Sequence, residues 1–324
     1  MSSTQLVYAV LSCLFYCAVG PVLIFLNKHI LADTGYKFPV ALTLLGMLCS
    51  SSIAFILCAL GISKRENAAQ VTVPFYMRNI MPIGLLIGAT MYLGNMAYIY
   101  LSVAYLQMLK AFSPVILMCI SFAMGVEAPS RPLIAAVSII TAGTLESSIG
   151  ERHFSWIGFL AVMASTVCDC VRLLMQQRLL TDFKFGIIEG IYYIYPASAL
   201  WLALFFVFFE KEDFDKGGGM SIMAKFPSYF VGASLLGFCV NFASFLVIKY
   251  CSSLTLKVLS NARNAAIVVV AAMIFGEVIT PNQIVGYTIT LGGFIYYNQV
   301  RASQAKAKEA LPGYEIVAKA PSGK

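Results

Sequence analysis

Long apolar stretches separated by short polar loops make up most of this chain. A helix needs about 20 mostly apolar residues to cross about 30 Å of hydrocarbon, and this pattern repeats along the sequence. It predicts ten membrane-spanning helices. Their expected bounds are residues 7–31, 38–61, 78–101, 103–125, 131–149, 154–178, 187–209, 227–249, 253–276 and 281–300.

The composition agrees with a chain that is embedded in a bilayer. Of its 324 residues, 60% are apolar and only 11% are charged, with a mean hydropathy of +0.82. A water-soluble domain of this length could not bury so much apolar surface in one core. The first apolar stretch lacks the basic start of a cleaved signal peptide, so we expect it to remain as the first helix. No Ser- and Arg-rich leader precedes it, which favours a membrane of the secretory pathway.

Lysine and arginine in the short loops predict the orientation of the chain. With a cytosolic N-terminus, most of them fall on the cytosolic side, as the positive-inside rule requires. We therefore expect both termini in the cytosol. Residues 301–324 have no periodic apolar face and are expected to form a disordered cytosolic tail.

Ten helices divide into two sets of five, which would lie in opposite orientations in the membrane. Two similar segments support such an inverted repeat, with residues 7–149 and 154–300 as its halves. Each has glycines ahead of an Asn-x-Ala triplet that begins at Asn95 or Asn241. We expect Gly84 and Gly88 to allow close helix packing, and we count both asparagines as candidate binding residues.

The charges inside the spans are the sharpest functional signal. Lys110 lies about 10 Å into the fourth span at about 1.5 Å per residue. Keeping a charge at such a depth costs about 3 kcal/mol unless water, a counter-charge or an anionic ligand meets it. Gln107 and Ser113 lie on the same helix face as Lys110, so we expect this face to line a polar cavity.

The ninth span adds Lys257, Arg263 and Asn264. The planar fork of an arginine suits bidentate contact with phosphate, and a lysine adds a compact point charge. With Lys110 from the first half, these residues predict a phosphate-binding site where the two halves meet. Lys257 is nearer the start of the span, so either ligand contact or a position at the interface is open.

Asp169 and Arg172 are three residues apart in the sixth span, a spacing that predicts a structural ion pair. No catalytic motif is present: there is no nucleophile with a neighbouring base, no zinc motif and no phosphate-binding glycine loop. We expect neither a metal nor a cofactor, and no enzyme activity.

In these residues the chain resembles the triose-phosphate and nucleotide-sugar translocators of the drug/metabolite transporter superfamily, and most closely the plant and algal sugar phosphate/phosphate translocator-like members. The markers run in order along the chain: Asn27-Lys28-His29-Ile30-Leu31, Gln107-Met108-Leu109-Lys110-Ala111, Asp169 with Arg172, Tyr192-Tyr193 with Pro196, and Ser252-Ser253-Leu254-Thr255 running to Arg263-Asn264. The resemblance implies that Lys110 and Arg263 hold the substrate phosphate. Plastid members have Lys-Arg where this chain has Arg263-Asn264, which looks more like a nucleotide-sugar or Golgi member.

The expected function is exchange of a nucleotide sugar or sugar phosphate for a nucleoside monophosphate or inorganic phosphate by alternating access. The alternative is a proton-coupled exporter of unphosphorylated solutes with the same fold. The expected partners are the phosphorylated substrate and the lipid bilayer, with a homodimer left open and no nucleic acid.

Overall fold

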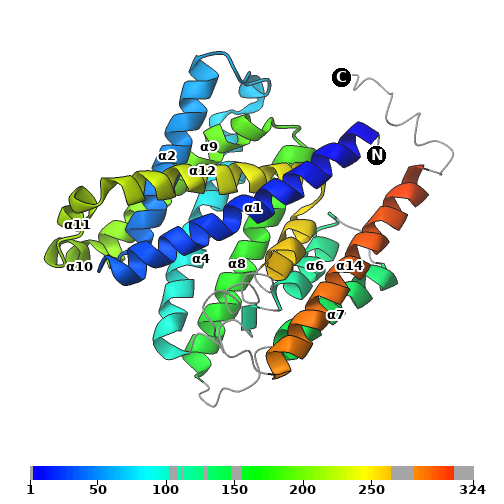
Figure 1. The fold of residues 1–324 in the computed structure, drawn as a ribbon. Coiled ribbons are helices and arrows are strands. Elements are labelled where there is room, and N and C mark those ends of the chain that lie inside the picture. Colours follow the sequence, from blue (N-terminus) through cyan, green and yellow to red (C-terminus); the bar gives the residue numbers. More distant parts are fainter. Residues whose placement is uncertain are drawn as a thin grey trace.

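The structure is a computed structural model, and it describes residues 3–101, 109–110, 112–126, 130–146, 155–263 and 281–309. Within these ranges every regular element is a helix, and the helices form one bundle (Figure 1). The expected all-α class is therefore confirmed for the part of the chain that the structure describes.

Among the described residues, five helices are long and apolar enough to cross a membrane. They are α1 (Ser3–Asp33), α2 (Pro39–Ala59), α8 (Trp156–Thr181), α9 (Ile187–Phe209) and α12 (Pro227–Tyr250). The other expected spans contain α4 (Met81–Tyr100), α6 (Ser113–Ala123), α7 (Arg131–Glu146), α14 (Pro281–Glu309) and a helix at residues 253–263, called the 253 helix below. Leu11, Leu14, Phe55 and Phe208 are among many large apolar side chains on the surface, as a lipid-facing bundle requires.

Two of the differences from the predicted boundaries are informative. The third expected span starts inside a π turn at Tyr76–Ile80, which follows a short helix, α3 (Val73–Phe75), and precedes α4. Pro82 has no N–H for a bond to the carbonyl four residues earlier, so regular α geometry does not run through this point. At the other end, α14 continues past residue 300 to Glu309, so the first part of the expected tail is helical. Residues 310–324 lie outside the described residues.

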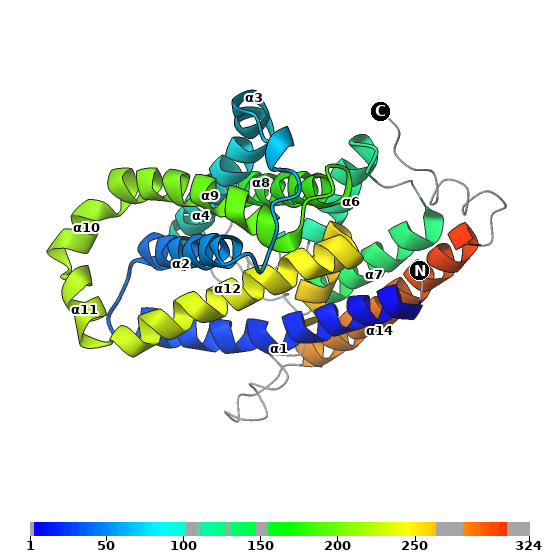
Figure 2. The same cartoon turned by 90° about the horizontal axis from the view of Figure 1, so that it is seen from above.

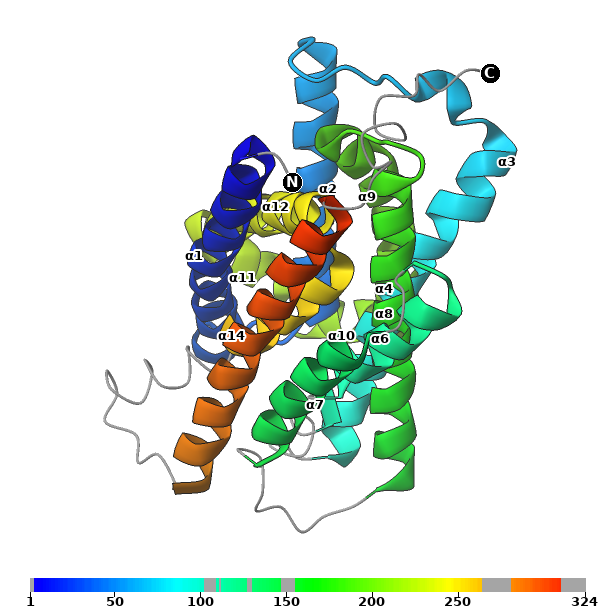
Figure 3. The same cartoon turned by 90° about the vertical axis from the view of Figure 1, so that its right-hand side faces the viewer.

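The helices pack in pairs that join distant parts of the chain. α1 packs along α12, α4 along α8, α2 along α9, and α7 along α14. Figures 1 and 3 show the start of α1 and the end of α14 at the same end of the bundle. Two short helices, α10 (Lys211–Lys216) and α11 (Gly219–Lys225), connect α9 to α12 at the edge of the molecule, as Figure 2 shows.

Glycines bring α4 close to α9, as expected from the sequence. A Cβ at Gly84 would lie 2.8 Å from the carbonyl carbon and oxygen of Ala197, and one at Gly88 would lie 2.6 Å from the ring of Phe205. Gly84 thus meets main chain, which cannot move aside as a flexible side chain can.

Two carboxylates at opposite ends of α9 bind the segment that follows α2 and the first turn of α2. Glu189, in the first turn of α9 and only 1% exposed, accepts bonds from the Asn67 main chain at 2.9 Å and from its side-chain amide at 3.1 Å. Glu210, directly after α9, accepts bonds from Val40 N–H at 3.1 Å and Ala41 N–H at 2.7 Å in the first turn of α2. Burial raises the pKa of Glu210, although these two bonds act in the opposite direction.

We expect Glu210→Ala to destabilise the protein, because two N–H groups of α2 lose their partner. Loss of a helix N-cap costs about 1 kcal/mol, and a buried donor left unpaired costs about 1–3 kcal/mol. The melting temperature of the purified protein in detergent measures this. Glu210→Gln, which keeps an acceptor oxygen, should lose less; equal losses in the two variants would contradict the capping role.

We expect Gly84→Ala to destabilise the fold by about 1–3 kcal/mol, the usual cost of an overpacked contact. The added methyl group would push α4 away from the main chain of Ala197. The matched control is Gly292→Ala in α14, where nothing lies within 4 Å of the added Cβ. Melting temperatures of the two variants compare directly, and a Gly84→Ala protein as stable as the control would contradict the close approach.

Candidate functional site

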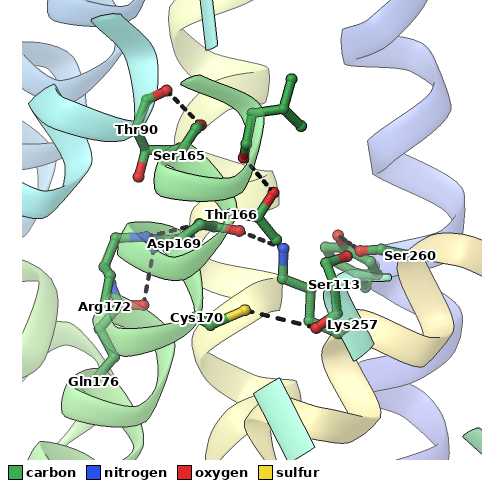
Figure 4. Close-up of polar contacts among 12 residues, drawn as sticks. Thr90, Ser113, Ser165, Thr166, Asp169, Cys170, Arg172, Gln176, Lys257 and Ser260 are labelled. Atoms are coloured by element: carbon green, nitrogen blue, oxygen red, sulfur yellow. Dashed lines mark hydrogen bonds and ion pairs between the residues drawn. The ribbon is translucent and has the colours of Figure 1, made fainter. Parts of the chain in front are cut away.

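The 253 helix lies between α8 and α1 and directs its two predicted cations to different neighbours. Lys257 reaches toward α8, where its amino group donates to Oδ2 of Asp169 (Figure 4). Its side chain is 18% exposed and that of Asp169 is 20% exposed, so both charges lie inside the bundle. Lys257, a predicted substrate-binding residue, is therefore paired with a carboxylate in this conformation.

Asp169 also holds Arg172, the residue one turn further along α8. The arginine donates to Oδ1 through Nε at 3.1 Å and through a terminal nitrogen at 2.6 Å. Its other terminal nitrogen donates to the side-chain oxygen of Gln176 at 3.0 Å. The network has one negative and two positive charges, so it is compensated only in part.

Hydroxyl and thiol groups on the same stretch of α8 bind neighbouring main chain. Ser165 donates to the carbonyl of Thr90 in α4 at 2.9 Å. Cys170 contacts the carbonyl of Ser113 at the start of α6 at 3.6 Å, a weak hydrogen bond. Figure 4 shows Ser113 beside Lys257. The ion pair thus lies where α6, α8 and the 253 helix come together.

Arg263 contacts α1. Its guanidinium carbon lies 4.7 Å from the ring centroid of Tyr16, within the range of a cation–π interaction. The Tyr16 hydroxyl lies 2.6 Å from that of Ser260, which fixes the ring against the 253 helix. A Cβ at Gly20 would lie 2.0 Å from a terminal nitrogen of Arg263, so a side chain at this position would displace the guanidinium.

Arg263 keeps unused hydrogen-bonding capacity. Its Nε is buried and has no partner among the residues that the structure describes, and the same holds for Nδ2 of Asn261. A buried donor without a partner costs about 1–3 kcal/mol, which an anionic ligand would offset. Arg263 is thus held in place through its ring contact while at least one of its N–H groups is still available.

The remaining predicted residues are described unevenly. Lys110 is helical and half-buried, and Asn241 is half-buried in α12. Gln107 and Asn264 lie outside the described residues, as does the side chain of Asn95. Within the described ranges no three His, Cys, Asp or Glu side chains are grouped so that they could hold a metal ion.

Sequence reasoning missed Tyr16 and Gly20. Their four-residue spacing places them on one face of the first helix, which is a weak signal of a shared contact. Nothing in the sequence indicates that this face meets the ninth span, more than two hundred residues away.

Comparison with known proteins places this arrangement in a family. The profile of the Triose-phosphate Transporter family matches residues 6–298. A probable sugar phosphate/phosphate translocator of Arabidopsis thaliana is 34% identical over 304 residues, which are 91% of this chain and 87% of that protein. A GDP-mannose transporter of the same plant is 26% identical over 310 residues, which are 94% and 89% of the two chains.

A solved crystal structure shares the fold. It matches with a TM-score of 0.65 at 16% identity, covering 93% of this chain and all of that one. The family match over almost the whole chain and the apolar helices together indicate an integral membrane transporter. This chain belongs to the triose-phosphate transporter family.

Proposed function

We propose that this protein is an antiporter. It exchanges a nucleotide sugar or sugar phosphate for a nucleoside monophosphate or inorganic phosphate across an endomembrane, with the Golgi as its compartment. The observation that carries the proposal is Arg263, a buried guanidinium that is fixed by Tyr16 and has an Nε without a described partner. The relatives named as a sugar phosphate/phosphate translocator and a GDP-mannose transporter support a phosphorylated cargo.

In this proposal Lys110 and Arg263 hold the phosphate from the two halves of the carrier. The site is completed by Lys257, Gln107, Asn264, Asn95 and Asn241. An empty site that holds two cationic side chains resists crossing the occluded state, because positive charge is costly in the apolar interior. A bound phosphate removes that cost, so the loaded carrier changes conformation and the empty one does not. This yields obligatory exchange.

The pairing of the helices supports ten spans arranged as inverted repeats. With α1, α2, α4, α6 and α7 as spans one to five, the second half starts at α8 and ends at α14. In an inverted repeat, each span of one half corresponds to the span five places away in the other half. The pair α1–α12, which is spans one and eight, then corresponds to α8–α4, which is spans six and three, and the helices of both pairs pack against each other. The pairs α2–α9 and α7–α14 turn into themselves. A carrier with both termini on the cytosolic side agrees with the start of α1 and the end of α14 lying at one end of the bundle.

The proposal predicts that exchange needs an internal anion and both cations. The purified protein would be reconstituted in liposomes preloaded with phosphate, UMP or GMP, and uptake of labelled nucleotide sugars and sugar phosphates measured. Lys110→Ala and Arg263→Ala should each lose tenfold or more in transport, since a charge-assisted hydrogen bond contributes about 1.5–3 kcal/mol. The control Lys216→Ala removes an exposed lysine of α10, whose partner is Glu212.

Either of two results would overturn this function. Uptake that ignores the internal anion, or that survives both substitutions, would instead indicate a general exporter of unphosphorylated solutes. In that case a dependence on the proton gradient should appear.

The contact with α1 yields a separate prediction for Gly20→Ala. The added methyl group would displace the guanidinium of Arg263 from Tyr16, and the flexible end of the arginine can yield without unfolding the protein. We expect transport to fall about tenfold at a nearly unchanged melting temperature. Gly46→Ala in α2, where nothing lies within 4 Å of the new Cβ, is the matched control. If Gly20→Ala transports as well as Gly46→Ala, Tyr16 and Gly20 do not position Arg263.

A further inference from the structure

Asp169 is unusual for its place in the bundle. It lies in the middle of α8, and within the five apolar spans it is the only acidic residue away from a helix end. A carboxylate at that depth costs about 3 kcal/mol unless a cation compensates it. A negative charge near the site of an anion carrier repels the substrate. We therefore expect this carboxylate to act while the site is empty.

The two carboxylate oxygens of Asp169 serve different cations. Oδ1 accepts both bonds from Arg172, and Oδ2 accepts the bond from Lys257. If Lys257 turned away, Asp169 would still be paired with Arg172 on the same helix. The contact between α8 and the 253 helix can therefore open without leaving a buried carboxylate unpaired, which is the costly case.

Lys257 is suited to changing partners. Its ammonium group sits on a flexible four-carbon stem and has three donors, whereas an arginine fork is fixed by its planar geometry. One turn further along the same helix face, Nδ2 of Asn261 is buried without a partner among the described residues. An anion between these two groups could accept a bond from the unpaired amide of Asn261. It could also accept one from the ammonium group of Lys257 in place of Asp169.

We propose that Asp169 is the resident counter-anion of Lys257, and that the phosphate of the substrate replaces Asp169 on this lysine. This rests on the proposed function. In the empty carrier Asp169 neutralises Lys257 and keeps it out of the phosphate site. A phosphate monoester carries about −1.5 to −2 charges at neutral pH and competes well with a single carboxylate. When the substrate is released, Asp169 pairs with Lys257 again. This competition lowers the affinity for phosphate and allows turnover.

The test uses Asp169→Asn, Lys257→Gln and the double variant in liposomes, with phosphate, UMP and GMP as the transported anions. In Asp169→Asn nothing competes for Lys257, so we expect KM to fall about three- to tenfold and the maximal rate to fall as well. In Lys257→Gln we expect KM to rise severalfold. The double variant should behave like Lys257→Gln, because Asp169 acts only through this lysine.

The direction of the change in KM and the double variant separate this role from two others. If Asp169 only holds α8 to the 253 helix, Asp169→Asn and Lys257→Gln break the same contact, and KM should not fall in either variant. If the freed Arg172 binds the anion, Asp169→Asn will lower KM by the same factor with and without Lys257. Either result would overturn the proposal.

Two further measurements keep the outcome decisive. The rise in melting temperature on adding phosphate, UMP or GMP to the detergent-solubilised protein reports binding without transport, and should be larger in Asp169→Asn than in wild type. If Asp169→Asn does not fold, the KM of Lys257→Gln is the test. This variant should fold, because Asp169 is still paired with Arg172. An unchanged KM in Lys257→Gln would overturn the proposal. Failure of the function itself would show elsewhere, as exchange that survives Lys110→Ala and Arg263→Ala.

Discussion

The arrangement around the site depends on the cost of placing cations on a helix inside an apolar bundle. The 253 helix carries two, and each is compensated by a different neighbour: Lys257 by a carboxylate of α8, and Arg263 by an aromatic ring of α1. The helix cannot rotate about its axis without losing one of these contacts. Its orientation, and with it the direction in which Arg263 presents its remaining N–H groups, is set by charge compensation on two sides.

The two compensations differ in strength and in what they leave available. A carboxylate neutralises the ammonium group and occupies it, whereas a ring face attracts the guanidinium without using its N–H donors. Arg263 can therefore be held and still bind an anion, while Lys257 must exchange one partner for another. The 253 helix thus combines Arg263, whose position is fixed, with Lys257, which can change its partner.

The sequence predicted the helices and the expensive charges better than it predicted which charges meet. Apolar runs such as 187–209 and 227–249 contain their own boundary signals, so the observed α9 and α12 match them closely. Asp169 and Arg172 meet as their three-residue spacing suggested, because both lie on one helix. The contact of Lys257 with Asp169 and that of Tyr16 with Ser260 depend on how distant helices pack, which no local spacing encodes. The π turn before α4 has no signal in the apolar pattern, because Pro82 lies within a continuous apolar run.

The two carboxylates at the ends of α9 differ in what they require of their partners. Glu189 binds the side chain of Asn67 as well as its main chain, so it constrains the identity of residue 67. Glu210 binds only main-chain N–H groups, at Val40 and Ala41. Any residue except proline can supply such a donor. This contact therefore persists when the side chains at positions 40 and 41 change, and sequence covariation between relatives would not reveal it.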